Sequence, residues 1–119
     1  MSKIMVIEED GAMRVLISEW LACEGHDVRA LPRHGSASDN TVDLVILDLP
    51  HPRSRGDETA RAVQAVREAY PRAAVIGIST QLGRSLGVDS GAARALGVNR
   101  LLAKPGTREE LLGAVAEAL

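Results

Sequence analysis

The sequence contains no phenylalanine, one tryptophan and one tyrosine, so its hydrophobic core must be built almost entirely from aliphatic side chains. It has a single cysteine, Cys23, which excludes a disulfide within the chain and fits a reducing compartment. No apolar run approaches the roughly 20 residues that a membrane helix needs, and no charged-then-apolar signal sequence opens the chain. We therefore expect a cytoplasmic protein that does not cross a membrane.

The sequence also has no large excess of positive or negative charge. The 119 residues include 14 Lys and Arg against 16 Asp and Glu, which gives a formal net charge of −2. The arginines are scattered, and Arg84, Arg94 and Arg100 come nearest to a cluster. This balance disfavours binding of nucleic acid by this chain. The hydrophobic content of 45% argues against disorder, and the length suits one domain, residues 1–119.

Short apolar runs alternate with amphipathic segments along the chain. The runs are too short for helix cores and predict strands over residues 3–7, 28–31, 42–47, 73–78 and 99–103. Helical spacing of apolar residues predicts helices from Asp10 or Gly11 to Gly25, from Asp57 or Glu58 to Pro71, over residues 91–96, and from a cap at Thr107 to Leu119. This alternation is typical of an α/β fold with a parallel sheet.

One connection in this pattern is weak. Residues 32–41 must cross over between the second and third strands, yet they are polar, rich in turn formers and without apolar periodicity. A crossover between parallel strands normally takes a dozen or more residues and contains a helix. We expect at most one helical turn here.

Polar side chains follow four of the five predicted strands, at the point where each strand ends. They are Glu8-Glu9-Asp10, Asp48, Ser79-Thr80 and Lys104-Pro105. Because the carboxyl ends of parallel strands meet at one edge of a sheet, these groups should converge there. Carboxylates beside a hydroxyl and an ammonium group indicate a divalent-metal site next to a phosphoryl acceptor.

In this order and at these strand ends, the motifs resemble those of response-regulator receiver domains, the phosphoryl-accepting modules of two-component signalling. The resemblance covers the whole chain, including the closing run Glu109-Glu110-Leu-Leu-Gly-Ala-Val. It implies a flavodoxin-like, doubly wound sheet of five parallel strands in the order 2-1-3-4-5. The second crossover would be shortened relative to the family.

The resemblance also implies a role for each group at the predicted edge. Asp48 would accept a phosphoryl group from a sensor histidine kinase or a phosphotransfer protein. Mg²⁺ would be held by the side chains of Glu8, Glu9 and Asp48 and by the main-chain carbonyl of Pro50. The phosphoryl group would be contacted by Ser79, Thr80 and Lys104, while Pro105, after a cis peptide bond, and Leu101 would have structural or switching roles.

Three of these positions depart from the family pattern. Glu9 stands where aspartate is usual, so its carboxylate must fold back to reach the metal. Pro50 has no N–H to donate to the phosphoryl group, a loss of about 1.5–3 kcal/mol for a charge-assisted hydrogen bond. Leu101 stands where an aromatic switch residue is common. We therefore expect slow or atypical phosphorylation.

Three functional classes are compatible with such a sheet. The first is a stand-alone receiver that is not an enzyme beyond its own phosphorylation and dephosphorylation, and that acts by binding a downstream protein; a homodimer is also compatible with it. A receiver cut from a longer regulator would show the same sequence. The second is a pseudo-receiver, which binds proteins without phosphorylation. The third, a flavin or nucleotide binder or a metal enzyme, is disfavoured because the acidic loop after residue 7 lacks a glycine-rich phosphate cradle.

Overall fold

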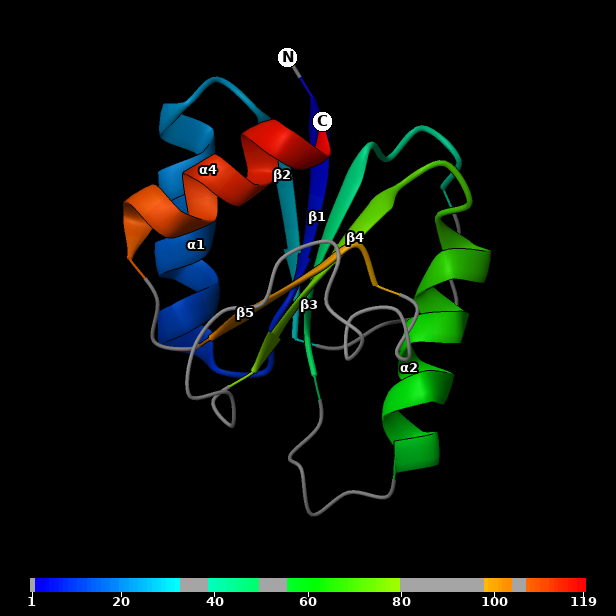
Figure 1. Ribbon diagram of the computed structural model, residues 1–119. Coiled ribbons are helices and arrows are strands. Elements are labelled where there is room, and N and C mark those ends of the chain that lie inside the picture. The colour runs from blue at the N-terminus through cyan, green and yellow to red at the C-terminus, as the bar shows by residue number, and fades with distance from the viewer. Residues whose placement is uncertain (1, 33–38, 50–55, 80–97, 104–106) are drawn as a thin grey trace.

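The computed structural model describes residues 2–32, 39–49, 56–79, 98–103 and 107–119, and only the backbone of residues 56–60, 79, 101 and 103. In these ranges a single sheet lies between helices (Figure 1). The elements in chain order are β1 (Lys3–Ile7), α1 (Gly11–Cys23), β2 (Asp27–Leu31), β3 (Leu44–Asp48), α2 (Gly56–Ala69), β4 (Ala74–Ser79), β5 (Arg100–Ala103) and α4 (Arg108–Ala118).

All five predicted strands are present, and their ends differ from the prediction by at most two residues. The largest difference is in β3, which begins at Leu44 rather than at residue 42 and includes Asp48 as its last residue. The predicted helix over residues 91–96 lies outside the described residues. In the second crossover, Pro32 and residues 39–43 are not helical, and the rest of that connection also lies outside the described residues.

The sheet is parallel throughout, with the strand order β2-β1-β3-β4-β5. This is the predicted order, so the doubly wound flavodoxin-like topology is confirmed. The central strand β3 is buried from Leu44 to Leu47, which explains its nearly continuous apolar sequence. The edge strand β2 is exposed at Asp27, Arg29 and Ala30 and half-buried at its other two residues.

Two aliphatic layers pack against the two faces of the sheet. Helices α1 and α4 lie together on one side and α2 lies on the other (Figure 1). The α1/α4 layer contains the largest buried side chains of β1, β3 and β4 and includes the half-buried Trp20. The α2 layer includes Val63, Val66 and Tyr70, and Tyr70 is only 3% exposed. The one tryptophan and the one tyrosine therefore stand in opposite layers.

Local signals in the sequence account for the ends of the helices. Thr107 caps α4 as predicted, because its side chain accepts a hydrogen bond from the N–H of Glu110 at 3.0 Å. After α1, Gly25 adopts a φ of +87°, a conformation that glycine tolerates best, and its N–H donates to the carbonyl of Ala22.

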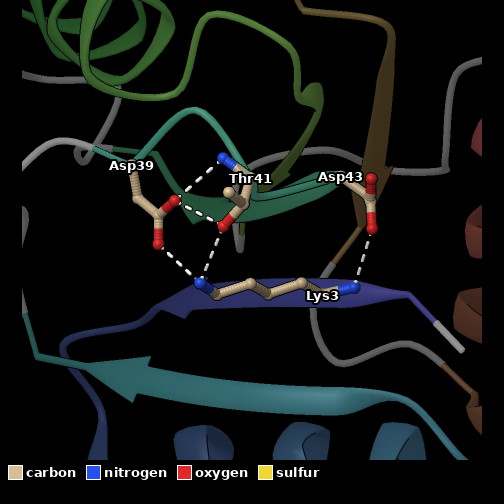
Figure 2. A network of polar contacts seen from close by, with 4 residues as sticks. All are labelled: Lys3, Asp39, Thr41 and Asp43. Atoms are coloured by element: carbon tan, nitrogen blue, oxygen red, sulfur yellow. Dashed lines mark hydrogen bonds and ion pairs between the residues drawn. The ribbon is translucent and has the colours of Figure 1, made fainter.

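Lys3 connects the start of β1 to the connection that precedes β3 (Figure 2). Its ammonium group donates to Asp39 Oδ2 at 2.6 Å and to Thr41 Oγ1 at 2.9 Å. Its backbone N–H donates to Asp43 Oδ2 at 2.9 Å, and the N–H of Asp43 donates back to the Lys3 carbonyl at 2.8 Å. One residue of β1 is thus held at both its backbone and the tip of its side chain.

Asp39 is the acceptor at the centre of this network. The Lys3 ammonium group, followed by the hydroxyl and the N–H of Thr41, holds the pKa of the Asp39 carboxyl well below its usual range. The backbone N–H of Asp39 donates to the Ala69 carbonyl at 2.9 Å, which attaches the same residue to the end of α2. Burial, and then the negative charge of Asp39, raise the pKa of the neighbouring Tyr70 hydroxyl.

We expect Asp39→Asn to unfold at a lower urea concentration than the wild type at pH 7. Because folding lowers the pKa of Asp39, its stabilisation is complete above the unfolded-state pKa of about 3.9 and disappears as the pH falls through the folded-state pKa. The difference between the two proteins should therefore shrink below about pH 4. Asp27→Asn, at an exposed carboxylate on β2, is the matched control; an equal loss in this variant would contradict the assignment.

Candidate functional site

The acidic turn after β1 places its first two carboxylates in different environments. Glu8 is fully buried, and its backbone N–H donates to the Leu31 carbonyl at 3.0 Å, which extends the β1–β2 pairing by one residue. The Glu8 Oε1 atom accepts a hydrogen bond from the N–H of Asp10 at 3.1 Å. Glu9 is exposed. The chain therefore directs the first carboxylate into the edge of the sheet and leaves the second in solvent.

Asp10 has a third, different role, because it begins the helix that follows the turn. Its Oδ1 atom accepts hydrogen bonds from the N–H groups of Ala12 at 2.9 Å and Met13 at 3.2 Å. Both groups belong to the first turn of α1, where N–H donors have no partner within the helix. Asp10 is thus an N-cap residue.

Arg14 ties α1 back to the acidic turn. Its Nη1 atom donates to the main-chain carbonyl of Glu8 at 2.9 Å and lies 3.4 Å from that of Glu9. A guanidinium group is planar and always charged, so it can bind two carbonyl oxygens at once. These contacts were not predicted from the sequence. The only signal was the position of an arginine one turn into a predicted helix, and that position does not specify a carbonyl acceptor.

Asp48 lies at the end of the strand next to the acidic turn. The register pairs Ile7 with Leu47, so Glu8 and Asp48 are the next residues on two neighbouring strands. Asp48 is half-buried. The N–H of Leu49 donates to the Ile78 carbonyl at 2.9 Å, which keeps the chain leaving β3 against β4.

The structure describes the backbone of two further predicted positions, Ser79 and Leu101. Ser79 is the last residue of β4 and pairs with Ala103, the last residue of β5, so these two strands end together at the same edge of the sheet (Figure 1). Leu101 lies within β5, opposite Gly77. The other predicted site residues, Pro50, Thr80, Lys104 and Pro105, lie outside the described residues.

The described donor groups fit a magnesium ion held by few protein ligands. No group of three Asp, Glu, His or Cys side chains able to hold a metal occurs in the described ranges. The edge does present two carboxylates, Glu8 and Asp48, at neighbouring strand ends. Mg²⁺ commonly takes one or two carboxylates and completes its shell with water and phosphate oxygens. A site of two carboxylates therefore suits it.

Comparisons with known proteins agree with this architecture. No family model matches the chain. The transcriptional regulatory protein CpxR of Escherichia coli is 27% identical over 123 residues, an alignment that covers all of this chain and 50% of CpxR. The chain thus spans about half the length of the curated relatives it matches.

Solved structures match over nearly the full length. A response regulator from Thermotoga maritima aligns with a TM-score of 0.76 and 20% identity, covering 99% of this chain and 97% of that one. The chemotaxis protein CheY4 of Vibrio cholerae aligns with a TM-score of 0.72 and 21% identity, covering 100% and 99%. The fold is therefore that of CheY-like domains.

The resemblance drawn from the motifs is confirmed: the chain is similar to a response regulator over its whole length, and the solved structures that share its fold include response regulators and receiver domains. None of the helices in the described ranges has the length and apolar character needed to cross a bilayer.

We expect Asp10→Ala to lower the free energy of unfolding by about 0.5–2 kcal/mol, the usual loss on removing an N-cap acceptor. Asp10→Asn keeps an acceptor oxygen and should stay close to the wild type. Urea unfolding of the three proteins at neutral pH measures the difference. Equal stability of Asp10→Ala and the wild type would show that the cap does not stabilise α1.

Proposed function

We propose that this protein is a receiver that accepts a phosphoryl group on Asp48, in a reaction that requires Mg²⁺. The observation that carries the proposal is the placement of buried Glu8 and half-buried Asp48 at neighbouring strand ends. The ends of β4 and β5 lie at this same edge. An edge of this kind, outside the carboxyl ends of parallel strands, is where open α/β sheets bind ligands.

The site must overcome the repulsion between a carboxylate nucleophile and a phosphoryl group. Glu8, Glu9, Asp48 and the carbonyl of Pro50 would hold Mg²⁺, and the bound ion would offset the negative charge between the reacting oxygens. Lys104 would pair with Asp48 and then with phosphoryl oxygens. The hydroxyls of Ser79 and Thr80 would donate to the phosphoryl group, so that their loop moves when Asp48 is modified.

The donor would be a phosphohistidine on a sensor kinase or a phosphotransfer protein, and the output would be binding of a downstream protein. The homology to a transcriptional regulator supports a place in such a pathway, and the matched half of that regulator accounts for all of this chain. A cytoplasmic location follows from this role. A homodimer is compatible with the same output.

A pseudo-receiver is the second candidate function. It is favoured by the exposure of Glu9 and by the lack of a group of three metal-ligating side chains among the described residues. Pro50 adds to this, because it cannot donate an N–H to a phosphoryl group. In this reading the same surfaces bind partners, and Asp48 stays unmodified.

Incubation with acetyl phosphate and Mg²⁺, followed by intact mass measurement, separates the two functions. We expect one added phosphoryl group on the wild type, none on Asp48→Asn and none when the metal is chelated. An ordinary receiver labelled in parallel verifies the phosphodonor. Failure of the wild type to gain mass, both here and with kinase-bound phosphohistidine as the donor, would leave the pseudo-receiver as the function.

The longer side chain of Glu9 should slow phosphorylation. We expect Glu9→Asp to bind Mg²⁺ more tightly and to be labelled severalfold faster by acetyl phosphate, because the shorter carboxylate need not fold back to reach the metal. Mg²⁺ titration of amide NMR signals measures the affinity without phosphorylation. Glu19→Asp, which makes the same change at an exposed position of α1, is the matched control. A slower rate in Glu9→Asp would mean that the glutamate is adapted to its position.

A further inference from the structure

A hollow lies at the opposite edge of the sheet from Asp48. It has a volume of about 460 Å³ and is open to solvent. Its walls come from the last turn of α2, from the turn that leads into β4 and from the residues that precede β5, and are lined by Arg67, Arg72, Ala73, Ala74, Val98 and Asn99. These segments are brought together by the pairing of β4 with β5.

Among the residues that the structure describes, the lining of this hollow offers hydrogen-bond donors and no carboxylate. No hydrogen bond or ion pair joins Arg72 to another side chain in the part of the chain that the structure describes. Arg67 takes part in another interaction, so Arg72 is the cation available to a ligand. Arg72 is exposed, so its guanidinium group is hydrated until a ligand displaces the water.

Asn99 is held in a fixed position on the wall of the hollow. Its Oδ1 atom accepts a hydrogen bond from the N–H of Val75 at 2.8 Å, and its own N–H donates to the Val75 carbonyl at 2.8 Å. The Nδ2 amide group, which is a donor only, remains available to a ligand. A fixed amide donor and a guanidinium group at the same hollow favour an acceptor with more than one oxygen.

Charge differs on the two sides of Arg72. A neighbouring hollow of about 480 Å³ shares Arg72 and Ala74 but includes Asp43. The carboxylate of Asp43 already accepts the backbone N–H of Lys3. An anion should therefore enter the hollow that contains Arg67 and Asn99, where none of the described lining residues is acidic.

We propose that this hollow binds an oxyanion, the carboxylate or phosphate group of a ligand, through the guanidinium group of Arg72 and the side-chain amide of Asn99. A guanidinium group presents two parallel donors to such a group, which gives both charge pairing and orientation. Strand β4 has six residues, so about 17 Å of strand separates this edge from the phosphorylation edge. Both edges can be occupied at once, and the site does not depend on phosphorylation of Asp48.

Inorganic phosphate and acetate are the probes for a titration followed by ¹H–¹⁵N NMR without Mg²⁺, at an ionic strength held constant with sodium chloride. We expect saturable shifts of the Asn99 side-chain amide with at least one of the two probes. Saturation by phosphate alone or by acetate alone supports the site and identifies its oxyanion. Shifts that rise linearly without saturation, for both probes, would overturn the proposal.

Arg72→Gln should weaken the binding about tenfold, the usual effect of losing a charge-assisted hydrogen bond. Arg72→Lys keeps the charge but not the fork of donors, so its affinity for the anion should lie between those of the wild type and Arg72→Gln. Arg29→Gln removes the same charge from an exposed position on β2 and is the matched control. An equal weakening in Arg29→Gln would show that net charge, rather than this hollow, attracts the anion.

Discussion

The parallel register between β1 and β3 is the constraint on which the predicted site depends. A slip of one residue would turn every side chain of a strand to the opposite face, and Glu8, the residue after β1, would no longer lie next to Asp48. The register is fixed at the other end of the two strands, where Lys3 and Asp43 exchange hydrogen bonds. Contacts at the amino-terminal edge thus determine which carboxylates meet at the carboxyl edge.

The same contacts compensate for the weak second crossover. The polar segment between β2 and β3 has little apolar surface to bury, so packing alone would position it poorly. Asp39 instead bonds to the Lys3 ammonium group, to Thr41 and to the carbonyl at the end of α2. A network of charge-assisted bonds can hold a connection in place where few apolar side chains are available to pack.

Much of the fold could be predicted from the sequence, because its signals are local. The apolar runs mark each strand, and the Thr107 cap marks the last helix. The position of Asp48 at a strand end also followed from local pattern. What could not be predicted depends on contacts between distant residues. The partners of Lys3 lie 36 to 40 positions away, and the burial of Glu8 beside an exposed Glu9 is set by the packing of β1 against its neighbours.

The two core layers contain one natural fluorophore each. Trp20 packs within the α1/α4 layer and Tyr70 within the α2 layer. Trp20 fluorescence and the near-ultraviolet absorbance of Tyr70 therefore report on opposite sides of the sheet in the unmodified protein. If both signals change over the same denaturant range, the two layers unfold as one cooperative unit; separate transitions would mean that one face of the sheet loses its packing before the other.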